Sequence, residues 1–356
     1  MFDAETAELI RKAPSLTGIN PQELPQLLTQ SYTELVSARI KHMESDQEGE
    51  NDFEEVINRL TEIAETYETI ALLTEKIADK RPAAFVSGTA YQILSRAVPV
   101  STDDIPLFDR DYIAAEIAAS LLFLASEQNP DARETAYTIK SNIENSNFIL
   151  NMLGQSLKNL CREEYDAIIN RAKERLQYRQ AKLGQTSEEQ ATLHLYEAIL
   201  EGVELLVSQI LEIGNLPSYS GRFENAQSAF SKVLELSNLS HGSVNNLTTT
   251  YPGPQHLATL LMAVTGVLEN ASIQKITPPN GVDDKKWRQW LGYRAKTKPI
   301  LWPNHRQALA NNFHETGTSA IMVLPTGAGK TTLSEVKIAG NLARSKNVIF
   351  LAPTNS

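Results

Sequence analysis

The sequence predicts a mainly α-helical protein, in which a large all-α domain is followed by the start of an α/β domain. Up to about residue 276, apolar residues recur at helical spacing in segment after segment, without strand-like alternation. From residue 301 onward, short apolar runs typical of buried strands flank a glycine-rich loop. We therefore expect a helical domain over 1–276, a linker over 277–300 and an incomplete α/β domain over 301–356.

The first part of the helical domain contains two long apolar patterns. Pro21 opens a segment whose apolar residues continue at helical spacing to Ile40. From Phe53 to Ile77 the steps alternate between three and four, with Thr74 as an interruption, which predicts one long helix packed at a shallow angle against another. A coiled coil between chains is the alternative. Packing inside the same domain is favoured because further apolar helices follow at once.

Turn and capping signals divide the rest of the helical domain. Asn129-Pro130-Asp131 ends one helix and starts the next, and Thr186 with Glu189 has the pattern of a capping box. Residues 221–236 resemble one helix of a tetratricopeptide repeat, but no second copy follows at the required period, so convergent patterning is the better interpretation. The expected helices cover 82–97, 110–126, 131–158, 162–183, 187–213 and 256–273.

Composition limits the class of protein. The net charge is −10, but residues 281–356 contain 11 basic and 4 acidic residues, a net charge of +7, so the acidic remainder is unsuited to be a general nucleic-acid surface. Cys161 is the single cysteine and allows no internal disulfide. The start of the chain lacks a signal-peptide pattern, and no apolar stretch reaches membrane-spanning length. We expect a cytoplasmic protein with no membrane partner.

The linker contains a basic and aromatic segment over residues 285–298. Trp287, Trp290 and Tyr293 are spaced so that they could share one helical face, among six basic residues. Two interpretations stay open: the rings stack on the bases of a single-stranded nucleic acid, or they anchor the helical domain on the domain that follows. The anchor is favoured because two tryptophans so close in sequence are usually buried.

A strand, loop and helix pattern follows, and it has the chemistry of a polyphosphate site. Glycines in the loop let backbone N–H groups point at phosphate oxygens, and the following helix adds positive potential. Lys330 is expected to reach the β and γ phosphates, and the Thr331 hydroxyl to hold Mg²⁺. We therefore predict ATP and Mg²⁺ as cofactors. The predicted nucleotide-binding residues are Pro325, Thr326, Gly327, Ala328, Gly329, Lys330, Thr331 and Thr332.

This loop resembles motif I of superfamily 2, DEAD/DEAH-box-like helicases, although Leu324 stands where the strict P-loop pattern has glycine. Upstream, residues 301–309 resemble the segment in which a glutamine of that family reads adenine. His305 lies nearer that register and Gln307 two residues on, so both are candidates. Downstream, an expected strand over 347–351 leads into a segment that resembles motif Ia. The resemblance implies nucleic-acid contacts there by Pro353 and Thr354.

The resemblance implies a RecA-like domain, and an ATP-dependent helicase or translocase acting on DNA or RNA, with Lys330 as the catalytic residue. The acidic box and arginine fingers that hydrolysis needs in this family are not found in the sequence. We therefore expect the N-terminal part of a longer enzyme, inactive alone. The layout resembles bacterial anti-phage defence helicases such as that of the Hachiman system, which works with a nuclease. The alternative is a helical interaction module that recruits a protein partner, such as a nuclease, with a vestigial or regulatory nucleotide site.

Overall fold

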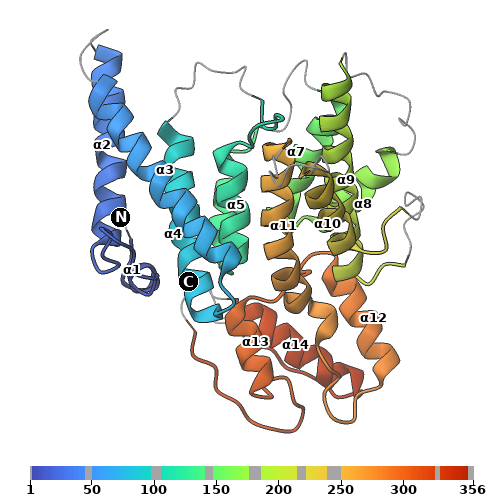
Figure 1. Cartoon of the computed structure of the whole chain (residues 1–356). Coiled ribbons are helices and arrows are strands. Elements are labelled where there is room, and N and C mark those ends of the chain that lie inside the picture. The colour runs from blue at the N-terminus through green and yellow to red at the C-terminus, as the bar shows by residue number, and fades with distance from the viewer. Residues whose placement is uncertain are drawn as a thin grey trace. The chain divides into compact units, whose positions relative to one another are not determined.

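The computed structural model describes residues 2–44, 50–97, 106–140, 147–175, 186–214, 222–238, 250–324 and 329–351. The fold is mainly α-helical, as predicted (Figure 1). The chain divides into two compact units. Unit 1 comprises Met1–Val207 and Asn215–Val267, and unit 2 comprises Ser208–Gly214 and Leu268–Ser356. Within the described ranges, no helix is both long enough and apolar enough to cross a membrane.

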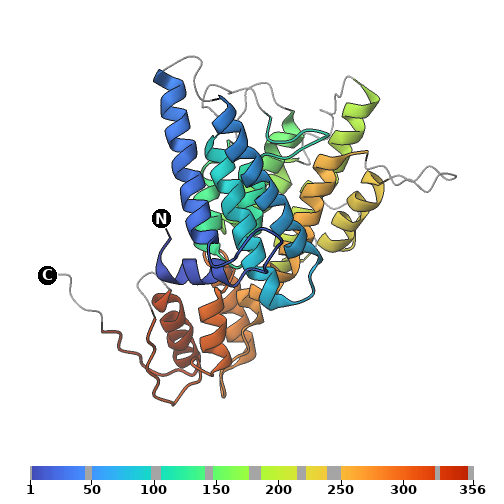
Figure 2. The ribbon, with the colours of Figure 1, turned by 60° about the vertical axis from the view of Figure 1, so that its left-hand side comes forward.

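Unit 1 begins with four helices that pack in sequence order. They are α1 (Ala4–Arg11), α2 (Leu24–Glu44), α3 (Glu50–Leu73) and α4 (Ile77–Ala97). Helix α3 packs against α2 and, more extensively, against α4, and the blue helices run alongside one another in Figures 1 and 2. The favoured interpretation of the apolar pattern, packing within the same domain, is therefore confirmed.

The single helix expected from Phe53 to Ile77 is wrong at its C-terminal end. The chain leaves the helix after Leu73 and begins α4 at Ile77, and these two side chains are 78% and 68% exposed. The Thr74 hydroxyl accepts a hydrogen bond from the backbone N–H of Lys76 at 3.4 Å. A threonine hydroxyl that bonds the backbone N–H two residues further on favours a turn over continuation of the helix.

Small residues allow close packing along α4. The Ser87 hydroxyl donates to the carbonyl of Ala64 in α3 at 2.7 Å. On the side facing α5 (Ala115–Ala125), a Cβ added at Gly88 would lie 3.2 Å from the ring of Phe123. The ring therefore takes the space that a larger residue at position 88 would need, and α4 can approach both neighbours.

The helix expected over 131–158 is wrong, because two helices occupy this stretch. Helix α6 (Asn129–Ala136) starts at the predicted Asn129-Pro130 boundary, and α7 (Phe148–Cys161) begins after Asn147. The Asn147 side chain accepts from the N–H of Ile149 at 2.9 Å, which caps α7. Such a cap marks a new helix start that the apolar periodicity alone did not reveal.

Unit 1 closes with α8 (Tyr165–Arg175), α9 (Ser187–Ile210), α10 (Ala226–Ser237) and α11 (Pro252–Ala271). The predicted capping box before α9 is confirmed. The N–H of Thr186 donates to the Glu189 carboxylate, and the N–H of Glu189 donates to the Thr186 hydroxyl, each at 3.1 Å. This reciprocal pair satisfies two backbone donors at the start of the helix.

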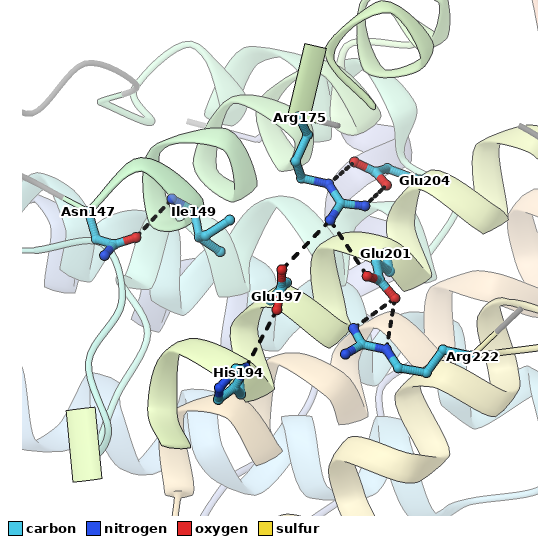
Figure 3. Close-up of polar contacts among 8 residues, drawn as sticks. All are labelled: Asn147, Ile149, Arg175, His194, Glu197, Glu201, Glu204 and Arg222. Atoms are coloured by element: carbon cyan, nitrogen blue, oxygen red, sulfur yellow. Dashed lines mark hydrogen bonds and ion pairs between the residues drawn. The ribbon is translucent and has the colours of Figure 1, made fainter. Parts of the chain in front are cut away.

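A buried charge network joins α8 to α9 (Figure 3). The Arg175 guanidinium donates to both carboxylate oxygens of Glu204, at 3.1 and 2.7 Å, and lies 3.5 Å from Glu201 and 3.9 Å from Glu197. Arg222, ahead of α10, binds the other side of Glu201 at 2.8 Å. Two arginines thus hold three carboxylates of one helix, which fixes α9 against its neighbours.

Unit 2 includes the C-terminal ends of α9 and α11. It also contains the short 3₁₀ turn η2 (Ile273–Lys275) and the helices α12 (Asp284–Ala295), α13 (Pro303–Ala310) and α14 (Lys330–Ala343). Helix α12 packs against η2 and α14, and α13 packs against α14. The strands expected at 321–324 and 347–351 are not formed in the described part of the chain, where these residues have no regular secondary structure and Ile321 is 94% exposed. A single pair of strands is marginal in water, because its faces and edges stay uncovered.

Candidate functional site: the start of helix α14

The predicted phosphate loop leads directly into α14. Gly329 has φ = +77°, a left-handed conformation that favours glycine, and Lys330 is the first residue of the helix. The side chains of Lys330 and Thr331 are exposed, whereas that of Thr332 is buried. Lys330 and Thr331 can therefore reach a ligand, and Thr332 is a packing residue. The other loop candidates, Pro325, Thr326, Gly327 and Ala328, lie outside the described residues, as do Pro353 and Thr354.

Two backbone donors are open at the start of α14. The N–H groups of Thr332 and Leu333 donate to the carbonyl of Gly329 at 3.0 and 3.4 Å. Those of Lys330 and Thr331 have no acceptor among the described residues. Open N–H groups, the helix dipole and an exposed ammonium together suit an anion of high charge. The exposed Thr331 hydroxyl beside them is of the kind that binds a phosphate-bound Mg²⁺, so the residues present fit the predicted cofactors.

Side-chain contacts hold α14 in place within unit 2. Its buried face includes Val336 and Leu333, and Arg294 of α12 forms an ion pair with Glu335. The Lys337 ammonium donates to the carbonyls of Phe313 and Glu315 at 2.9 and 3.0 Å, and burial lowers the pKa of this lysine. The start of α14 is therefore carried by a helix with polar contacts to α12 and to the turn after α13.

His305 lies directly beside Gly329, the residue before α14. Its ring is buried, and its Nε2 atom would be 2.1 Å from a Cβ added at Gly329. Its Nδ1 atom accepts from the N–H of Trp302 at 3.3 Å, and the two rings stack at 5.7 Å. His305 is thus held against the backbone of Gly329.

Gln307, the other candidate for reading adenine, is placed differently. It is exposed and lines a groove of about 640 Å³ formed by α13 and the segment from Asn311 to Leu324. The other polar residues along this groove are Asn304, Asn311, Asn312, Glu315, Thr318 and Ser319. The volume is within the range of small-molecule sites. The two candidates therefore have separate environments: Gln307 lines a groove and His305 packs against Gly329.

The aromatic residues of α12 do not share one environment, so the expected common face is wrong. Trp287 is fully buried and its Nε1–H donates to the carbonyl of Ile276 at 3.0 Å. Trp290 is half-buried, with its ring centroid 5.0 Å from that of Trp287, whereas Tyr293 is 75% exposed. Tyr293 follows Trp287 by six positions, so the two side chains point in different directions around the helix axis. Trp287 anchors α12 inside unit 2.

Sequence reasoning missed the contacts that link these elements. His305 and Gly329 are separated by 24 positions, and Arg294 and Glu335 by 41. No local pattern encodes either contact. The sequence signal for this site is local: a glycine-rich loop that ends at Gly329, directly before Lys330.

Comparisons with known proteins support the same end of the chain. The family model described as "Type III restriction enzyme, res subunit" matches residues 303–356. No significant match was found among curated proteins or among solved structures. The matched residues include α13, the loop and α14. This segment of the chain is therefore similar to a helicase-like domain of superfamily 2.

Proposed function

We propose that residues 301–356 bind ATP with Mg²⁺ and serve an ATP-dependent helicase or translocase that acts on nucleic acid. The observation that carries this proposal is the start of α14. A left-handed Gly329 there precedes two open N–H groups and the exposed side chains of Lys330 and Thr331. These are the groups that hold a polyphosphate and its metal in P-loop proteins. The similarity of residues 303–356 to a helicase-like family supports the reaction class.

In this proposal, different residues bind the phosphates, the metal, the base and the nucleic acid. The Lys330 ammonium neutralises charge on the β and γ phosphates, and the Thr331 hydroxyl holds Mg²⁺, which would supply further charge neutralisation when bound. Gln307 contacts the base from the adjoining groove. His305 acts as a positioning residue, since its ring packs on Gly329. Pro353 and Thr354 contact the nucleic-acid backbone.

Calorimetric titration with a non-hydrolysable ATP analogue and Mg²⁺ tests the nucleotide site. Binding is the appropriate readout because no acidic box for hydrolysis was recognised in the sequence. We expect Lys330→Ala to weaken binding at least tenfold while the helical circular dichroism stays unchanged, because this side chain is exposed. The matched control is Lys346→Ala, another exposed lysine of unit 2. Equal affinity in wild type and Lys330→Ala would reject the role of Lys330.

Unit 1 supports a second candidate, a protein-interaction module. It forms its own compact unit and contributes none of the loop residues. In this proposal unit 1 recruits a protein partner such as a nuclease, in keeping with the layout of anti-phage defence helicases, and the nucleotide site is regulatory or vestigial. Absence of nucleotide binding in the titration above, with the fold retained, would favour this candidate over the motor.

A further inference from the structure

Helix α12 presents a continuous exposed face that contributes nothing to the packing of unit 2. Lys285, Gln289, Tyr293 and Lys296 follow one another at steps of four, four and three, which places them on one side of the helix. All four are exposed. We call this set the α12 face. It extends about 16 Å along the helix axis.

Tyr293 provides a flat apolar surface at the centre of this face. Its side chain is 75% exposed, a larger fraction than for any other aromatic side chain among the described residues. Trp287, which is fully buried, already anchors the helix, so the Tyr293 ring is not needed to hold α12 in place. An exposed ring of this kind can stack on a nucleobase.

The lysines around Tyr293 are available to a ligand. Among the described residues, the ammonium groups of Lys285, Lys286 and Lys296 have no ion-pair partner. Arg294, on the inner side of the helix, is engaged by Glu335. The positive charge on the outer side of α12 is therefore largely uncompensated.

Acidic groups nearby do not cancel this charge. The Asp283 carboxylate accepts from the N–H of Lys286 at 2.9 Å and caps the helix. Asp284 and Glu212 lie 3.8 and 3.9 Å from the guanidinium of Arg288. Residues 283–298 contain six basic and two acidic side chains, so the segment keeps a net positive charge.

We propose that the α12 face, together with the neighbouring Lys286, binds single-stranded nucleic acid. A base stacks on Tyr293, and Lys285, Lys286 and Lys296 neutralise phosphates. A duplex would offer phosphates but keep its bases away from the ring, and an acidic protein segment would gain nothing from a stacking platform. This surface extends the proposed function, because it is a nucleic-acid contact outside the segment of Pro353 and Thr354 and does not depend on bound nucleotide.

Fluorescence anisotropy with labelled 20-residue oligothymidylate and oligouridylate, without ATP, tests the proposal. Tyr293→Ala is expected to weaken binding about five- to a hundredfold, from the loss of one stacked base, and Tyr293→Phe to restore it to within about twofold. The double variant Lys285→Ala/Lys296→Ala should lower the slope of log affinity against log salt by about 1.4. The matched control, Lys12→Ala/Lys173→Ala on exposed lysines of unit 1, should leave the slope unchanged.

The outcomes separate this proposal from the nucleotide site. The oligonucleotide titrations contain no ATP, so a failure of the nucleotide site to bind ATP would not affect the result. No binding by the wild type, equal binding by Tyr293→Ala, or preference for a 20-base-pair duplex would overturn the assignment. Tighter binding of poly-glutamate than of oligothymidylate would also overturn it, and would identify the face as an acidic-protein site.

Discussion

The imidazole of His305 occupies the space that a side chain at position 329 would need. A Cβ at Gly329 would lie 2.1 Å from His305 Nε2, far inside van der Waals contact, and Gly329 has φ = +77°. Two independent constraints therefore act on one residue of the loop: backbone conformation and a buried neighbour.

Gly329→Ala is expected to destabilise unit 2 through both constraints. The left-handed conformation costs about 1–2 kcal/mol for a residue with a Cβ, and the overlap with His305 adds to it. His305→Ala removes the overlap but not the conformational cost. Urea unfolding of the two single variants and the double variant should therefore give a coupling of at least about 0.5 kcal/mol. Additive effects would show that the ring does not obstruct position 329.

Trp287→Ala is expected to destabilise the protein by about 3–5 kcal/mol, because the ring is fully buried. Trp290→Ala, at a half-buried position on the same helix, should cost clearly less. Trp287→Phe keeps a ring but leaves the Ile276 carbonyl without its donor, a loss of about 1–3 kcal/mol. Chemical unfolding checks this order. Equal losses for Trp287→Ala and Trp290→Ala would contradict the anchor role.

Arg175→Met should be strongly destabilising at neutral pH. It leaves the Glu204 carboxylate buried without its cation, whereas Glu201 keeps Arg222, a change of about 3–5 kcal/mol. The loss should shrink as the pH falls, because a protonated Glu204 no longer needs the arginine. Arg222→Ala, at a side chain that is 41% exposed, is the matched comparison and should change stability by about 1 kcal/mol or less. Unfolding midpoints at pH 7 and pH 4 measure both, and a pH-independent loss in Arg175→Met would refute the explanation.

Glu116→Gln should make the protein relatively more stable as the pH rises. Burial raises the pKa of Glu116 above its ordinary value of 4.5, so its ionisation is easier in the unfolded chain. The stability that this group contributes is present below pH 4.5 and is lost as the pH rises through its folded-state pKa. The variant lacks this loss. Denaturation at pH 4 and pH 7 should show the difference in unfolding free energy shifting in favour of Gln; a pH-independent difference would contradict it.

The sequence predicts the elements whose signals are local. The Thr186–Glu189 box, the Asn129-Pro130 boundary and the start of α14 after Gly329 are short-range patterns of capping and backbone chemistry, and the structure has them in place. Apolar periodicity carried two helices too far, because it does not record where Thr74 or Asn147 bonds the nearby backbone. The opposite environments of Trp287 and Tyr293 depend on which side of α12 meets its neighbours.

Contacts between distant residues also limit what the sequence predicts about the candidate nucleotide site. Lys330 and Thr331 are exposed at the start of a helix, as their motif predicts, but the placement of His305 under Gly329 is a contact between distant residues. In the sequence, both His305 and Gln307 are candidates for reading adenine. Packing separates them, because the two residues lie on different sides of the same turn of α13, with the His305 ring buried and the Gln307 amide exposed to the groove.

The Lys337 side chain links α14 to the groove that Gln307 lines. Its ammonium holds the carbonyls of Phe313 and Glu315, and both residues line the groove beside Gln307. The Lys337 ammonium therefore connects α14 to residues that form the groove. Arg344, at the end of α14, contacts Thr316 of the same segment, so under the proposed function a displacement of α14 on phosphate binding would reach the segment that forms the groove through two basic side chains.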